Sequence, residues 1–127
     1  DLGLLALRVW IGLVLAFGHG IDKVSSFERF NASVDKLGLP LPEVLGTAAA
    51  LSEFIGGMLL VVGALTRPAA AAIATTMLVA ALHVHAADPF ARQELPLAYG
   101  VGAIALLLAG PGRISVDGLI FRSRAQG

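Results

Sequence analysis

The stretch LSEFIGGMLLVVGAL, residues 51–65, places one carboxylate, Glu53, inside a run that is otherwise almost entirely apolar. With the residues before it, the run covers residues 44–65, which is long enough for a helix to cross the roughly 30 Å hydrocarbon core of a bilayer. A carboxylate near the middle of such a helix costs about 2.5–3.5 kcal/mol on insertion scales and must face a partner or water. Glu53 is therefore expected to point toward other helices.

The composition of the whole chain also indicates a membrane protein. Of the 127 residues, 57% are hydrophobic and only 14% are charged, which is too little charge to cover a small water-soluble domain. The formal net charge is zero and no basic patch is present, so nucleic acid is not expected as a partner. Because the chain has no cysteine, it cannot supply thiolate ligands, and we expect no cofactor held by this chain alone.

Four apolar segments predict an all-α integral membrane four-helix bundle, because in lipid a helix satisfies all of its own backbone groups. We expect a single domain over residues 1–127, with helices at about 2–20, 44–65, 68–87 and 95–110. Small residues let neighbouring helices approach closely, and the expected helix-packing positions are Gly12, Gly56, Gly57 and Gly63.

The connection between the first two helices contains SSFERFNASVDKLGLPLP, residues 25–42, in which apolar side chains recur at helical spacing. Ser25 or Ser26 can cap the start of a helix there, and Gly38 followed by Pro40 ends it. We predict a short amphipathic helix that lies in the membrane interface. A helix packed on the rim of the bundle is the alternative.

The orientation in the membrane follows from the arginines. The predicted topology puts the N-terminus, the Arg67 turn and the C-terminal tail on one side, and the tail carries Arg113, Arg122 and Arg124. Basic residues are equally numerous on the two sides, but the tight turn and the tail favour the cytoplasm. We expect a multi-pass protein of the inner (cytoplasmic) membrane with both termini in the cytoplasm.

A polar stripe follows the first helix in RVWIGLVLAFGHGIDK, residues 8–23. At 100° per residue Arg8, Gly12, His19 and Lys23 fall on one face, which lipid would reject. The stripe is expected to line the interior, with Arg8 as the counter-ion of Glu53. Snorkelling of Arg8 to the nearer headgroups is the alternative.

The third helix ends in LHVHAADPF, residues 82–90, where His83 and His85 are two residues apart and so about 200° apart on a helix. Metal-binding pairs on helices prefer spacings of three or four, so no metal site is predicted. Glu94 is expected to cap the fourth helix, and Tyr99 can extend its hydroxyl into the bundle or the interface. Together with Glu53 deeper inside, the residues expected at the outer mouth are His19, Lys23, His83, Glu94 and Tyr99.

Such a polar mouth could admit a quinone headgroup or a small polar substrate, or could simply be the wet end of a bundle. After the fourth helix, GPGRISVDGLI, residues 110–120, is expected to form a turn in which Ser115 and Asp117 make local hydrogen bonds.

These motifs in this order resemble the DoxX family of small four-helix membrane proteins. The resemblance rests on RVWIGLVLAFGHGIDK, EFIGGMLLVVGALTR, MLVAALHVH, ELPLAYG and GPGRISVDG, and covers nearly the whole chain. It implies a membrane protein associated with respiratory or sulfur redox enzymes, the namesakes being subunits of a thiosulfate:quinone oxidoreductase. The positions that occupy the polar pattern of the family here are Arg8, His19, Lys23, Glu53, His83, Glu94 and Tyr99.

The leading hypothesis is therefore a membrane subunit of a respiratory or sulfur/quinone-linked oxidoreductase complex, in contact with lipid and with other subunits, that anchors the complex or lies next to a quinone site. A second hypothesis is a self-contained membrane enzyme that uses Glu53 for proton transfer. A third is a lipid-binding, small-molecule-binding or transport protein, although no inverted repeat or broken helix pair supports transport.

Overall fold

The computed structural model describes residues 1–125, which are built from helices and turns and contain no strand. The first helical segment combines α1 (Leu2–Leu13), η1 (Val14–Gly20, a π-helix) and α2 (Ile21–Ser25) in one continuous rod. This confirms the all-α prediction.

The second and third segments are built in the same way, each with a short π-helical stretch. The second contains α4 (Pro42–Leu51), η2 (Ser52–Gly56) and α5 (Gly57–Val62), and the third contains α6 (Thr66–Val79) and η3 (Ala80–Val84). Over residues 1–125, three helices are long and apolar enough to cross a membrane, namely Leu2–Ser25, Pro42–Val62 and Thr66–Val84. The chain is a membrane protein on this evidence and sits in a lipid environment.

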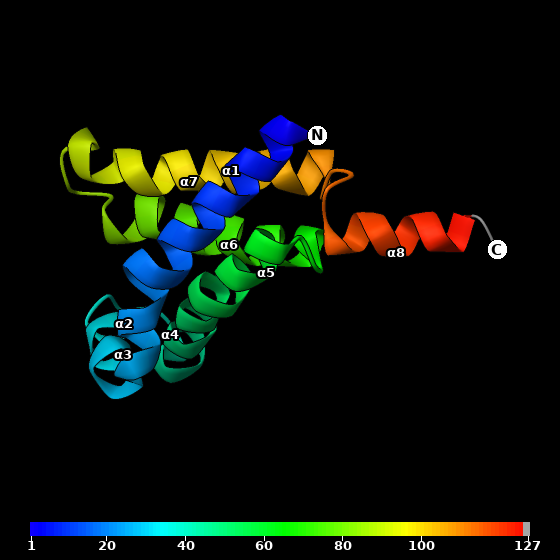
Figure 1. Ribbon diagram of the computed structural model, residues 1–127. Coiled ribbons are helices and arrows are strands. Elements are labelled where there is room, and N and C mark those ends of the chain that lie inside the picture. Colours follow the sequence, from blue (N-terminus) through cyan, green and yellow to red (C-terminus); the bar gives the residue numbers. More distant parts are fainter. Residues whose placement is uncertain (126–127) are drawn as a thin grey trace.

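The last long helix, α7 (Phe90–Ala109), packs along α6, as Figure 1 shows. It has 20 residues, but Arg92, Gln93 and Glu94 in its first turns make it less apolar than the other three. Its crossing of the membrane therefore stays a prediction. The chain then turns at Gly110 and continues into α8 (Val116–Ala125), a helix that the sequence pattern did not predict.

Several helix ends differ from the predicted ones. The second segment ends at Val62 rather than at residue 65, because Gly63 takes a left-handed conformation with φ of 71° that closes the helix. The third ends at Val84 rather than at 87, and α7 begins at Phe90 rather than at 95, directly after Pro89.

Glycines bring the first two segments into backbone contact. A Cβ added to Gly57 would lie 2.7 Å from the carbonyl oxygen of Gly12, so neither position has room for a side chain. Gly56 packs against Ile73 of α6. These contacts are consistent with the predicted packing role of the glycines, which stays a prediction. Gly63 ends a helix and is also closely packed, because a Cβ there would lie 2.8 Å from Arg8 Nη1.

The loop after the first segment forms α3 (Phe27–Asp35), which confirms a helix at this place. Val34 on its apolar face is buried, and Phe30 and Leu37 are half-buried. This face packs toward the bundle and contacts α4. A position in the membrane interface stays a prediction.

The two ends of the bundle are distinct. The N-terminus, the α5–α6 turn and the start of α8 gather at one end, and α3 and the α6–α7 connection lie toward the other (Figure 1). At the first end the backbone N–H of Arg113 donates to Asp1 Oδ1 at 2.7 Å. The grouping matches the predicted topology, while the side of the membrane on which this end lies stays a prediction.

Candidate functional site

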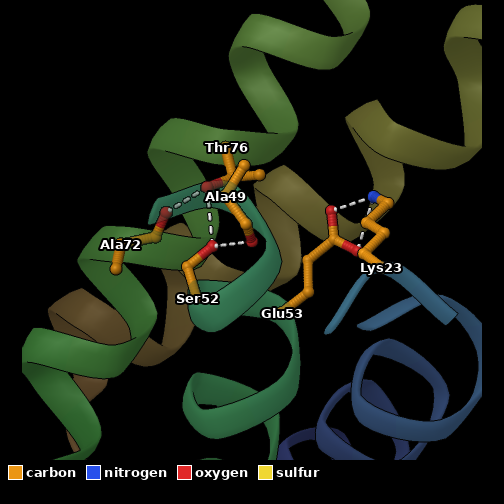
Figure 2. A network of polar contacts seen from close by, with 6 residues as sticks. All are labelled: Lys23, Ala49, Ser52, Glu53, Ala72 and Thr76. Atoms are coloured by element: carbon orange, nitrogen blue, oxygen red, sulfur yellow. Dashed lines mark hydrogen bonds and ion pairs between the residues drawn. The ribbon is translucent and has the colours of Figure 1, made fainter. Parts of the chain in front are cut away.

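Glu53 forms an ion pair with Lys23 inside the helix bundle. The Lys23 Nζ donates to both carboxylate oxygens, at 2.6 and 2.7 Å. The side chain of Glu53 is 1% exposed and that of Lys23 is 27% exposed. Lys23 Nζ also lies 5.0 Å from the ring centroid of Phe30 in α3, within the range of a cation–π contact. The buried acid is thus neutralised by the far end of the first helical segment (Figure 2).

Arg8 is not the counter-ion of Glu53, and that prediction was wrong. Its Nη1 donates to the carbonyl oxygens of Leu60 at 2.9 Å and Val61 at 2.7 Å, and its Nη2 donates to the carbonyl of Ile114. The last carbonyls of a helix have no partner within the helix, and here the guanidinium supplies one at the end of α5. Arg8 is 2% exposed, so the snorkelling alternative is also wrong.

Asp117 lies at the same end of the bundle as Arg8. Its Oδ1 accepts the N–H of Leu65 at 2.9 Å and its Oδ2 accepts the N–H of Thr66 at 2.8 Å, so it caps the start of α6. Burial raises the pKa of Asp117, but the hydrogen bonds from Thr66 and Leu65 and the charge of Arg8 outweigh it and hold the pKa below its usual value. The local turn predicted for Asp117 was therefore wrong. Ser115 does bond locally, to the Gly112 carbonyl and the Gly118 N–H.

Two cavities meet at the Lys23–Glu53 pair. The larger has a volume of about 610 Å³ and lies between α3, the middle of the second segment and α6. Most of its lining is apolar, including Phe30, Val34 and Leu37. The apolar face of α3 thus covers a cavity, which explains why this loop helix is amphipathic.

The smaller cavity has a volume of about 360 Å³ and a more polar lining that includes His19, Arg92 and Tyr99. Lys23, Glu53, Ala80 and His85 line both cavities. The ion pair therefore stands on the wall between a mainly apolar cavity and a smaller, more polar one.

The predicted polar mouth is only partly assembled. His19 and Tyr99 both line the smaller cavity, and their ring centroids are 6.3 Å apart. Glu94 is exposed, lines neither cavity and lies inside α7, so the prediction that it caps this helix was wrong. His83 is also exposed and lines neither cavity, and its Nε2 lies 3.4 Å from the Leu37 carbonyl oxygen.

Sequence reasoning left three residues of the site out of the predicted set. His85 follows the end of η3, so it turns away from the direction of His83, and its Nδ1 lies 2.7 Å from Asp88 Oδ2. Ser52 and Thr76 form a hydroxyl pair on the wall of the larger cavity, with their oxygens 2.8 Å apart. The Asp88–Pro89 pair is typical of a turn, and it could have indicated that the helix ends near His85. The contact between Ser52 and Thr76 could not be predicted locally, because it depends on how two helices meet.

Several residues of the site lie in the π-helical stretches. η1 contains His19, η2 contains Ser52 and Glu53, and η3 contains Ala80. Such wide turns are frequent at functional sites, because they redirect side chains from the regular helical face. In the part of the chain that the structure describes, no group of three or more His, Cys, Asp or Glu side chains could hold a metal ion.

The arrangement suits a neutral ligand better than a charged one. Lys23 and Glu53 neutralise each other, so an anionic head group would add uncompensated charge to a mainly apolar chamber. An ammonium has three N–H donors, of which two reach Glu53, and one is left for a ligand acceptor.

Comparison with known proteins agrees with this membrane setting. The family model described as DoxX matches residues 3–86. A protein of Bacillus subtilis (strain 168) named "Putative oxidoreductase CatD" is 29% identical over 128 residues, which cover 100% of this chain and 93% of that relative. No solved structure matches the chain.

Proposed function

This chain belongs to the DoxX family, and on that premise we propose that it is a membrane component of an oxidoreductase system whose larger cavity binds the ring of a membrane quinone. The name of the Bacillus relative supports the link to oxidoreductase chemistry. The quinone supplies the redox group that a chain without cysteine must borrow.

One observation carries the proposal: the buried Lys23–Glu53 pair stands on the wall of a mainly apolar cavity of about 610 Å³. This volume is in the usual range for small-molecule sites, about 300–1,000 Å³. A quinone head is neutral, and one of its carbonyl oxygens can accept the remaining N–H of Lys23, while its ring and tail pack on apolar side chains such as Val34 and Leu45.

We expect the chain to act as a single domain of the inner membrane, with four crossings, both termini in the cytoplasm and other subunits bound to it. The exposed apolar side chains along the spans, such as Phe17, Val62 and Leu82, suit lipid and helical partners. Electrons would then reach the quinone from a partner subunit.

Quinone binding is tested with the full chain in lipid nanodiscs. Decylubiquinone is titrated by equilibrium dialysis, and empty nanodiscs correct for partition into lipid. We expect Lys23→Met to weaken binding by about tenfold or more, the loss typical of a charge-assisted hydrogen bond in an apolar site. Glu53→Gln is expected to weaken binding as well, because it leaves the Lys23 ammonium without its counter-ion on the wall of a mainly apolar cavity.

Matched controls separate this effect from general charge changes. Glu43→Gln and Lys36→Met make the same chemical substitutions at exposed positions that line neither cavity. They are expected to bind decylubiquinone like the unaltered chain. Equal loss in the controls, or no saturable binding to the unaltered chain, would sink the quinone proposal.

The subunit role is tested by extracting the protein from its native membrane in mild detergent and identifying stoichiometric partners by mass spectrometry. Redox subunits in stoichiometric amount are the expected result. Recovery of the chain alone would contradict an obligate subunit and favour a self-contained enzyme that uses Glu53 for proton transfer.

A further inference from the structure

The hydroxyl groups in the larger cavity share one property. Four hydroxyl-bearing side chains lie among the described residues of its wall, and each one bonds to a carbonyl of its own helix. Ser33 is 2.6 Å from the Phe30 carbonyl and Thr75 is 2.9 Å from the Ala71 carbonyl. A hydroxyl whose hydrogen points back into its helix offers only lone pairs to a ligand.

Ser52 and Thr76 together have fewer hydroxyl hydrogens than hydrogen-bonding contacts. Three contacts connect them: Ser52 Oγ to the Ala49 carbonyl at 2.8 Å, Ser52 Oγ to Thr76 Oγ1 at 2.8 Å, and Thr76 Oγ1 to the Ala72 carbonyl at 3.0 Å. Two hydroxyl hydrogens serve these three contacts, so one contact always lacks a hydrogen (Figure 2). The pair therefore has an unfilled place for a donor from outside.

The Lys23–Glu53 pair also offers a ligand more hydrogen-bond acceptors than donors. A carboxylate can accept about four hydrogen bonds, and Glu53 receives two from Lys23. Ser52 and Glu53 are neighbours in η2, and Figure 2 shows their side chains pointing to different partners, one toward Thr76 and the other toward Lys23. The cavity thus offers a ligand several acceptors but one lysine N–H as donor.

From this imbalance we propose that the cavity binds the reduced, dihydroxy form of its ligand, a quinol, more tightly than the oxidised quinone. A quinone carries carbonyl acceptors and can use only the Lys23 donor. A quinol carries two O–H donors, which the Glu53 carboxylate and the Ser52–Thr76 pair can accept. This inference rests on the proposed function, because it names which redox form of the quinone fits the site.

The test compares the two forms under anaerobic conditions. Decylubiquinone and the quinol obtained from it by reduction are titrated separately against the full chain in nanodiscs. We expect the quinol to have about a tenfold lower Kd, the gain of roughly one net hydrogen bond in an apolar site. For a two-electron couple, tenfold corresponds to a rise of about 30 mV in the midpoint potential of the bound quinone.

The double variant Ser52→Ala/Thr76→Val removes the hydroxyl pair and keeps the ion pair. It is expected to raise the Kd for quinol more than the Kd for quinone, so that the ratio of the two values falls toward one, a split that a general disturbance of the cavity would not produce. Ser25→Ala is the control, because Ser25 also bonds to its own helix, at the Ile21 carbonyl, but lines neither cavity.

The outcomes separate the two proposals. Equal affinity for both forms, or equal loss of both in the double variant, would overturn the quinol preference and leave quinone binding standing. If neither form binds saturably, the proposed function is wrong and the preference is wrong with it.

Discussion

The two ends of this bundle both bury charged side chains, but they use them differently. At one end, Arg8 and Asp117 direct their polar atoms at backbone groups, with Arg8 at the end of α5 and Asp117 at the start of α6. At the other, Lys23 and Glu53 face each other on the wall between two cavities. Burial of charge in a membrane bundle therefore does not by itself mark a binding site. What distinguishes the second end is that its charged pair lines two cavities, so that a ligand can reach the charged groups.

The largest effect is expected from Arg8→Met. The change leaves the carbonyls of Val61 and Ile114 without their donor, while the Leu60 carbonyl keeps the N–H of Gly63. Each unsatisfied buried group costs about 1–3 kcal/mol, so we expect a loss of roughly 2–6 kcal/mol in stability. Thermal unfolding in detergent measures it. Arg67→Met, at an exposed position in the same end of the bundle, is the control. A melting temperature equal to that of the control would show that Arg8 does not stabilise the fold, and the contrast between the two ends of the bundle would then be wrong.

A smaller effect on stability is expected at the other end. Glu53→Gln or Lys23→Met alone leaves one charge without its partner and should cost about 1–3 kcal/mol, because Lys23 retains some access to solvent. The double variant removes both charges and should regain much of that loss, while quinone binding stays weak. Stability that does not recover in the double variant would show that the pair is held for packing rather than for a ligand.

The smallest effect is expected at Asp117 and depends on pH. Because its pKa is lower in the folded protein than the usual value of about 3.9, folding favours the carboxylate form. The contribution is complete at neutral pH and is lost as the pH falls through the lowered pKa.

Asp117→Asn should therefore cost about 1 kcal/mol near neutral pH and should flatten the fall in stability at acid pH. Unfolding measured from pH 7 down to pH 2 tests this, with Asp22→Asn at an exposed position as the control. If the free energy of unfolding falls as steeply at acid pH in Asp117→Asn as in the unaltered chain, other carboxylates cause the fall.

The sequence predicted the helical class, the inward direction of Glu53 and a tight connection between the second and third segments, because each follows from local apolar pattern and the cost of charge in lipid. The connection lies at residues 63–65 rather than at Arg67, which is inside α6. It did not predict the partner of Glu53, because that depends on how two helices are aligned. Contact of Gly12 with Gly57 sets an antiparallel register that puts Arg8 opposite Val61. Lys23 lies about 22 Å further along the helix than Arg8, at 1.5 Å per residue, and so lies nearer Glu53.

Other misses have a similar origin. α8 lacks a clear apolar stripe, so its pattern did not indicate a helix, and Asp117 caps a helix start about 50 residues earlier in the chain, which no local pattern reveals. The hydroxyls of Ser52 and Thr76 meet across two helices for the same reason.

The three π-helical stretches also bear on how such chains can vary in length. A π-turn closes with one more residue than an α-turn, so it stores a single extra residue within a continuous helix. Deleting one residue from η2 would restore regular α-geometry and leave the flanking helices in their present register, so that only the side chains within η2 would change direction. A one-residue insertion or deletion at this depth would therefore exchange the side chains that face the cavity and leave the helix ends and connections in place.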